Sequence, residues 1–155
     1  MTIKLLTLEE VMNFGQEITH FIFESNKNAA YMDSYTVEDA EKKMEELQLY
    51  MQSGKAVIVG AIEDNDLLGF LWAYTYPFRD DTNRLYLSII HVDEKYRNRK
   101  IGKQLLDRID EYAHKIGRCA IYLHAEAFNT GAIKFYKQNG FSPERIQLVR
   151  KVKSC

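Results

Sequence analysis

Five basic side chains crowd a short turn in the second half of the chain. They are Lys95, Arg97, Arg99, Lys100 and Lys103. The apolar residues 85–92 before this turn predict a β-strand, and Gly102 opens a stretch with helical periodicity. Free backbone N–H groups at a helix N-terminus point at an anion, and the helix dipole favours negative charge there. The turn therefore predicts a site that binds the phosphate of a small molecule.

Two polar residues further along the chain, Asn129 and Tyr136, are seven residues apart. Seven residues make two helical turns, so we expect both on one face of a helix over residues 130–139. Ala132 lies between them on that face, where its small side chain leaves room for a ligand. Phe135, in contrast, is interpreted as a core aromatic.

Other ligands suit the basic turn less well. The phosphate loop of nucleoside triphosphatases has an upstream glycine and a Ser or Thr after Gly-Lys, whereas Gln104 follows Lys103 here. Nucleic acid is disfavoured because stacking aromatics are sparse around the turn and the formal net charge is −1. Cys119 and Cys155 match no metal-binding or disulfide spacing, so we predict no metal site and a buried thiol at Cys119.

The length and composition predict an ordinary globular protein. A chain of 155 residues is long enough for one domain, residues 1–155, with a real core. Hydrophobic residues make up 46% of it and charged residues 28%. No apolar run approaches the ~18 residues that cross a bilayer, so no membrane partner is expected. The N-terminal residues are too acidic for a signal peptide, and we therefore expect a cytoplasmic protein.

The two halves of the chain differ in charge. Residues 1–76 hold 5 Lys and Arg against 13 Asp and Glu, a net charge of −8. Residues 77–155 hold 16 against 9, a net charge of +7. Solvated helix faces would explain the imbalance. The functional interpretation is that the C-terminal half binds an anion while the N-terminal half faces a cation.

The elements that position these residues are predicted from capping and periodicity. Capping boxes at Thr7 and Thr36 open helices that end near residues 25–26 and near Gly54. Val- and Ile-rich residues predict a hairpin over 56–76 with its turn at 64–66. The rest of the chain predicts a strand over 85–92, a helix over 101–116, a strand over 120–125, a helix over 130–139 and a strand over 146–152. A helical crossover makes strands 85–92 and 120–125 parallel neighbours.

Two motifs resemble those of the GNAT superfamily of acyl-CoA-dependent N-acyltransferases. The family's Arg/Gln-x-x-Gly-x-Gly/Ala loop is matched by Arg97, Lys100 and Gly102, with lysine at the first glycine position. The family's Asn-x-x-Ala-x-x-aromatic-Tyr-x-x-x-Gly-Phe pattern is matched by Asn129, Ala132, Phe135, Tyr136, Gly140 and Phe141. The order of elements resembles the family's over most of the chain, most closely over residues 85–141.

The resemblance implies an α/β fold of the α+β type. It has a mixed central sheet of six to seven strands and about four flanking helices, and strands 85–92 and 120–125 splay apart after a β-bulge. The implied activity is that of an N-acetyltransferase, which moves an acetyl group from acetyl-CoA directly to a primary amine with no covalent enzyme intermediate. A non-catalytic acyl-CoA-binding sensor or partner subunit is the alternative, since no obvious general base is present.

The resemblance also implies roles for individual residues. Coenzyme A would contact Ile90, His91, Val92, Arg97, Asn98, Arg99, Lys100, Ile101, Gly102, Lys103, Asn129, Ala132 and Tyr136. The basic turn would wrap the pyrophosphate, Asn129 would bond the pantetheine arm, and the Tyr136 hydroxyl would protonate the departing thiolate as general acid. A backbone N–H near Ile90 or His91 would polarise the thioester carbonyl. Lys100 must keep an ordinary backbone conformation or accept strain.

The general base is the least defined part of the site. Many relatives place Glu or His at positions matching Tyr86 and Ser88, and neither of these is a good base. We expect His91 on the opposite face of the strand, because adjacent side chains alternate. Glu126, acting through a water molecule, is the candidate base, and His124 or a chain of waters is the alternative.

The acceptor site is expected from residues 20–36, the loop 77–83 and the last strands. Its candidate residues are Glu24, Tyr31, Asp33 and Asp80. The acidic members predict a cationic acceptor, either a small molecule or a protein amine, and Trp72 is interpreted as core. The sequence leaves the acyl chain length open and is compatible with a monomer or a homodimer.

Overall fold

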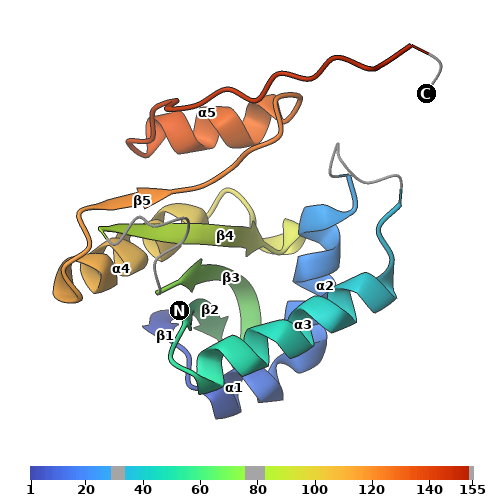
Figure 1. Ribbon diagram of the computed structural model, residues 1–155. Helices are drawn as coiled ribbons and strands as arrows, with labels where there is room; N and C mark the ends of the chain where they lie inside the picture. The colour runs from blue at the N-terminus through green and yellow to red at the C-terminus, as the bar shows by residue number, and fades with distance from the viewer. Residues whose placement is uncertain (29–33, 76–82, 154–155) are drawn as a thin grey trace.

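The structure, a computed structural model, describes residues 1–28, 34–75 and 83–153. Five strands form one mixed sheet in the order β1-β2-β3-β4-β5 (Figure 1). All neighbouring strands are antiparallel except β4 and β5, which are parallel. The strands are β1 (Thr2–Leu5), β2 (Ala56–Glu63), β3 (Asp66–Tyr74), β4 (Arg84–Val92) and β5 (Ala120–Tyr122).

Helices cover both faces of this sheet. They are α1 (Leu8–Asn13), α2 (Gly15–Asn26), α3 (Val37–Gln52), α4 (Ile101–Lys115) and α5 (Thr130–Gln138), with a short 3₁₀ helix η1 (Glu94–Tyr96) after β4. One hydrophobic cluster joins α1, α2 and α3 to the sheet, and a second joins α4 to the other face. Within the described residues, no helix is long and apolar enough to cross a membrane.

Local signals explain where the first helices begin. Thr7 and Thr36 form the predicted capping boxes with Glu10 and Asp39. The single helix predicted after Thr7 is wrong, because the structure has two helices that meet at Phe14. The backbone of Phe14 lies at φ −93° and ψ 21°, outside helical geometry, and Gly15, a poor helix former, follows it.

The predicted hairpin over residues 56–76 is confirmed as β2 and β3. Asp64 and Asn65 connect them at φ of 51° and 69°. Positive φ at both turn positions suits the right-handed twist of the flanking strands, and Asp and Asn tolerate it better than most residues. The hairpin supplies the centre of the sheet, where Phe70, Leu71 and Trp72 are fully buried. Trp72 is therefore core, as predicted.

The C-terminal part of the prediction is corrected in three respects. β5 is shorter than the strand predicted over 120–125, and the strand predicted over 146–152 is absent, since residues 142–153 form neither helix nor strand. The described sheet therefore has five strands instead of six to seven, because an extended segment becomes a strand only where it reaches a sheet edge. The Cys119 thiol, predicted to be buried, is exposed just before this edge strand.

Candidate functional site

A gap opens between β4 and β5. The two strands pair at only three positions, from Arg84 opposite Ala120 to Tyr86 opposite Tyr122. Just beyond, the pairing of β3 with β4 skips Ser88, which makes a β-bulge that bends β4. The predicted splay of these strands is therefore present, and it leaves one side of β4 without a strand partner past Tyr86 in the described part of the chain.

The backbone of β4 beyond the bulge offers hydrogen-bonding groups to this gap. The Asp93 N–H donates to the Leu68 carbonyl of β3 at 2.9 Å. Alternate residues of a strand point their backbone groups the same way, so His91 also turns toward β3, and Ile90 and Val92 turn toward the gap. Ile90 is therefore better placed than His91 to polarise a carbonyl there.

His91 lies on a different face from the one predicted. Its ring packs 5.0 Å from Phe21 of α2, and its Nδ1 lies 3.2 Å from the Ser25 hydroxyl. The extra residue at Ser88 shifts the alternation by one, and His91 consequently shares the helix-covered face with Tyr86. Burial, with the nearby Arg97 charge, lowers the pKa of His91 to about 4, so the ring is neutral at pH 7.

Two residues of the basic turn adopt left-handed backbone conformations. Asn98 has φ 67°, and Lys100, the residue before α4, has φ 61° and ψ 22°. Lysine therefore keeps the conformation that glycine would take, at a cost of about 1–2 kcal/mol. No side chain caps the N-terminus of α4. The backbone N–H groups of its first turn therefore have no side-chain acceptor there, and they suit a bound anion. The sequence left Lys100 either an ordinary backbone conformation or a strained one, and the structure shows the strained one.

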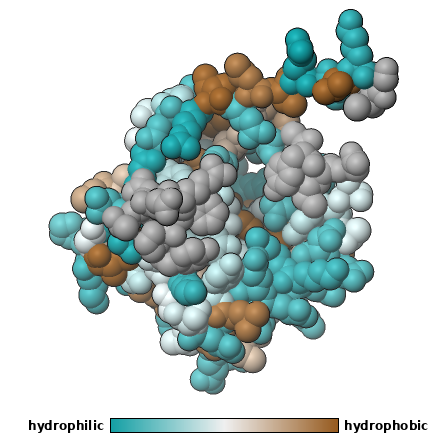
Figure 2. Space-filling view, in the orientation of Figure 1, coloured by the Kyte–Doolittle hydropathy of each residue, from teal (hydrophilic) through white to brown (hydrophobic). Residues whose placement is uncertain are grey.

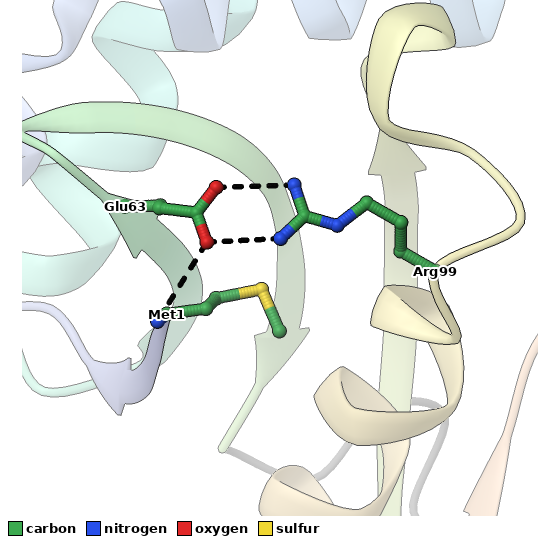
Figure 3. A network of polar contacts seen from close by, with 3 residues as sticks. All are labelled: Met1, Glu63 and Arg99. Carbon is green, nitrogen blue, oxygen red and sulfur yellow. Dashed lines mark hydrogen bonds and ion pairs between the residues drawn. The ribbon is translucent and has the colours of Figure 1, made fainter.

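Part of the positive charge of the turn is neutralised within the protein. Arg99 forms a bidentate pair with Glu63 at 2.9 and 3.1 Å, and the amino group of Met1 lies 3.7 Å from the same carboxylate (Figure 3). This pairing lowers the pKa of Glu63 and ties the turn to the β2–β3 hairpin. Lys103 pairs with Asp107 at 2.7 Å. Lys95 and Lys100 have no ion pair within the described residues.

Arg97 and Gly102 shape the two ends of the turn. The Arg97 Nε–H donates to the Val92 carbonyl at 3.3 Å, which holds the turn against the end of β4. A Cβ on Gly102 would lie only 2.9 Å from Cζ of Phe135. Glycine at this position therefore lets α5 pack against the first turn of α4. The interpretation of Phe135 as a packing residue is confirmed.

The two polar residues of the second motif lie at opposite ends of α5. Asn129 is the N-cap, and its side-chain oxygen accepts a hydrogen bond from the Ala132 N–H at 3.1 Å. Tyr136 sits between the rings of Phe135 and Phe141, at 5.5 and 5.6 Å. Burial raises the pKa of Tyr136 to about 12, so its hydroxyl remains protonated at every physiological pH. That hydroxyl forms no hydrogen bond within the described residues.

One pair of residues near the gap was not predicted. The Tyr86 hydroxyl lies 3.3 Å from Nδ1 of His124, and the two rings are 5.5 Å apart. Tyr86 is in the last paired position of β4, and His124 lies two residues after the end of β5. This contact depends on the register between β4 and β5. Composition and periodicity do not encode that register, so the sequence does not predict the contact.

The remaining candidates are only partly placed. Glu126 is half-buried, and its backbone carbonyl accepts from the Asn129 N–H at 2.9 Å. Glu24 on α2 is paired with Lys27 at 2.6 Å, which lowers the pKa of its carboxyl. Tyr31, Asp33 and Asp80 lie outside the described residues. No three His, Cys, Asp or Glu side chains gather as a metal site in the described parts of the chain.

The fold and the gap together define the class of protein. The sequence matches the Acetyltransferase (GNAT) family over residues 24–141, and the chain therefore belongs to this family of N-acetyltransferases. It is 27% identical to a spermidine N(1)-acetyltransferase of Thermoplasma acidophilum over 141 residues, 88% of this chain and 83% of that protein. It is 26% identical to a spermine/spermidine N(1)-acetyltransferase of Bacillus subtilis over 75% of this chain and 82% of that protein.

Solved structures share the same fold. An aminoglycoside N-acetyltransferase in complex with CoA superposes with a TM-score of 0.74 at 18% identity, covering 99% of this chain and 95% of that one. A putative acetyl transferase from Pyrococcus furiosus gives a TM-score of 0.72 at 22% identity, covering 97% of this chain and 100% of that one. Identities this low establish a common fold, and the acceptor has to be argued from the site itself.

Proposed function

We propose that this chain transfers an acetyl group from acetyl-CoA directly to a primary amine of a cationic small molecule. The observation that carries the proposal is the divergence of β4 and β5 past Tyr86 and Tyr122, next to the uncapped N-terminus of α4. An extended amide-containing arm fits such a gap as an added strand. A pyrophosphate at the end of that arm fits the N–H groups of α4 and the charges of Lys95 and Lys100.

The thioester would lie where the gap opens. The Ile90 N–H faces this position and would hydrogen-bond the carbonyl oxygen as negative charge develops on it. The amine attacks the carbonyl carbon, the tetrahedral intermediate collapses, and the carbon–sulfur bond breaks to release the thiolate of coenzyme A. Asn129, at the start of α5, would contact the arm on the other side of the gap.

Tyr136 would act on the departing sulfur. A phenol with pKa about 12 is a weaker acid than a thiol with pKa near 8.5, so full proton transfer would be uphill by about 5 kcal/mol. The hydroxyl therefore stabilises the thiolate by donating a hydrogen bond as charge develops, and solvent supplies the proton afterwards. This role needs a hydroxyl that stays protonated, which burial ensures.

His124 is the proton acceptor that we favour over Glu126. A protonated amine with pKa near 10 must lose a proton before it attacks, at a cost of about 4 kcal/mol at pH 7. The Tyr86 hydroxyl touches His124 and lies at the mouth of the gap, so the pair can accept the amine proton and pass it to solvent. Glu126 lies two residues further along, and within the described residues it makes no comparable contact with β4.

The acceptor class is supported by charge and by the relatives. Residues 1–76, which supply the helices over this face, carry a net charge of −8 from 5 basic and 13 acidic residues. The relatives named above are acetyltransferases of spermidine and spermine, which carry several positive charges. A field of this sign would raise the local concentration of a polycation.

The test is a turnover assay in which the free thiol of coenzyme A is measured with an amine panel. The panel contains spermidine, an aminoglycoside, a lysine peptide, a neutral amine and an amine with carboxylates. We expect turnover with the cationic amines and a loss of at least about tenfold in kcat for His124→Ala. Glu126→Gln is the matched control and should retain activity. Turnover limited to neutral or anionic amines, or CoA binding without turnover on any amine, would refute the proposal.

A further inference from the structure

One side chain ties the basic turn between β4 and α4 to a distant part of the chain. Arg99 donates two hydrogen bonds to Glu63, at 2.9 and 3.1 Å, in the parallel fork that a guanidinium and a carboxylate favour. Glu63 is the last residue of β2, 36 residues earlier in the chain. Figure 3 shows the two side chains pointing toward each other, one from the hairpin and one from the turn.

Glu63 is a fixed point to which the turn can be anchored. It is paired with Asp66 across the hairpin, and Asp64 and Asn65 close the hairpin with positive φ. A short loop of this kind fixes the register of the strands that it joins. Because β3 runs beside β4, the closed end of the hairpin lies next to the end of β4, where the turn begins.

Arg99 stands between the two strained residues of the turn. Asn98 has φ 67° and Lys100 has φ 61°, and neither has the conformational freedom of glycine. Residues in this region of φ persist only where the surrounding structure holds them. The Arg99 guanidinium has Glu63 as one partner, and it lies 5.9 Å from the centre of the Tyr96 ring. Arg99 is thus a point at which neighbouring elements hold the strained turn in shape.

The ion pair engages Arg99 with a carboxylate, so its charge is not left for a phosphate. The pair lowers the pKa of Glu63 and raises the pKa of Arg99, and both side chains therefore stay charged at neutral pH. Lys95 and Lys100, in contrast, form no ion pair within the described residues. The charge available to an anion at the turn comes from these lysines and from the backbone N–H groups.

We propose that Glu63 is a positioning residue for coenzyme A. Through Arg99 it holds the backbone N–H groups of the turn in the arrangement that binds the pyrophosphate, without contacting the cofactor itself. The inference rests on the proposed function, since it takes the turn as the pyrophosphate site. A positioning role and a purely electrostatic role predict opposite effects. Glu63→Gln removes a negative charge, which by itself favours an anion, whereas loss of position weakens binding.

The negative charge of the protein extends well beyond Glu63. Residues 1–76 hold 13 acidic residues against 5 basic ones. Figure 2 shows a mostly hydrophilic surface over α3, where Glu38, Glu41 and Glu45 are exposed. Exposed charges more than about 8–10 Å apart are largely screened at physiological salt. Glu63→Gln therefore changes the electrostatic field at the turn only slightly, and its main effect is the loss of the anchor.

The first test is the Kd for CoA, measured by titration calorimetry on the full chain. The side chains of Arg99 and Glu63 are 41% and 31% exposed, and an exposed pair has a modest energy. We therefore expect Glu63→Gln to raise the Kd by about threefold to fivefold. Asp64→Asn is the matched control, because it removes one charge from the next residue, which has no ion pair in the described part of the chain. Its Kd should be unchanged or lower, since asparagine tolerates the left-handed backbone at this position.

The second test is a double-mutant cycle with Arg99→Gln. If Glu63 acts through Arg99, Arg99→Gln raises the Kd by itself, and adding Glu63→Gln gives no further loss. Losses that add would show that the two side chains act separately.

Steady-state kinetics separate positioning from damage to the fold. In Glu63→Gln, the KM for acetyl-CoA should rise with the Kd, while kcat and the KM for the amine stay within about twofold of the parent. A fall in kcat without a change in the KM for acetyl-CoA would contradict a role at the turn.

The outcomes distinguish this inference from the proposed function. A Kd for Glu63→Gln equal to or below that of the parent overturns the inference and leaves the proposed function intact. Additive losses in the cycle, or an equal loss in Asp64→Asn, have the same meaning. A parent chain that does not bind CoA would refute the proposed function, and this inference with it.

Discussion

Two regions of this protein are packed to different extents. In the sheet from β1 to β4, with α1 to α4 against it, residues such as Phe70, Trp72 and Leu105 are fully buried. No described residue after Ala113 is buried, although β5 and α5 lie in that region. The first region is a core in the usual sense, and the second is a layer with partly exposed side chains on both sides.

This difference in packing indicates which region would gain buried surface when a ligand binds. The candidate CoA gap lies between β4 of the packed region and β5 of the open layer. A substrate in the gap would bury surface that the isolated chain leaves in water. The packed region holds the site in place, and the open layer is completed by what it binds.

The largest predicted effect separates the two regions by their contribution to stability. Leu105→Ala removes a fully buried side chain of α4 and should lower the free energy of unfolding by about 2–5 kcal/mol. Ile133→Ala in α5 removes a half-buried side chain and should cost about 1 kcal/mol or less. Urea denaturation measures both, and equal losses would show that the two regions are packed alike.

The second prediction concerns the pH dependence of the packed region. His91 has a folded pKa of about 4, below its unfolded value of 6.5, so the unfolded state binds more protons between these values. Stability should therefore be fully present above pH 6.5 and fall by up to about 3 kcal/mol as the pH drops toward 4.

His91→Gln isolates this effect from the other groups nearby. Glu24, His20, Arg97 and Asp93 all influence the His91 ring, and glutamine does not titrate. Thermal unfolding between pH 6.5 and 4.5 should depend less on pH in the variant than in the parent. Identical slopes would place the His91 side chain in water rather than against Phe21.

The third prediction tests whether the open layer contributes to the chemistry. Tyr136→Phe removes the hydroxyl that would stabilise the thiolate, so kcat should fall at least about tenfold while the affinity for CoA is retained. Tyr112→Phe, on α4, is the matched control and should have no effect on kcat. An unchanged kcat in Tyr136→Phe would leave α5 with a binding role alone.

The smallest predicted effect concerns the turn between the two regions. Lys100→Gly relieves the left-handed strain and should stabilise the protein by about 1 kcal/mol or less, since part of the gain is lost to the entropy of glycine. Lys100→Ala keeps the strain and removes the charge. Measuring the Tm and the Kd for CoA in both variants separates the backbone contribution from the contribution of the charge. A lower Tm for Lys100→Gly than for Lys100→Ala would show that the backbone of Lys100 is not strained.

Much of the fold follows from local signals. The capping boxes, the hairpin turn at Asp64 and Asn65, and the strand, turn and helix over 85–115 are all found where they are predicted. These features depend on neighbouring residues, so a single sequence encodes them well. The failures are the break at Phe14, where Gly15 follows as a poor helix former, and the strand over 146–152, which would need a distant sheet edge to pair with.

The sequence by itself determined the chemistry available at the candidate site: a basic turn before a helix, an N-capping asparagine and a tyrosine seven residues later. Tertiary structure alone decided how these groups are used. A bulge at Ser88 places His91 on the same face of β4 as Tyr86. An ion pair with Glu63 neutralises Arg99. The pairing of β4 with β5 brings His124 into contact with Tyr86. Each outcome depends on strand register or on contacts between residues far apart in the chain, where local sequence preferences have no influence.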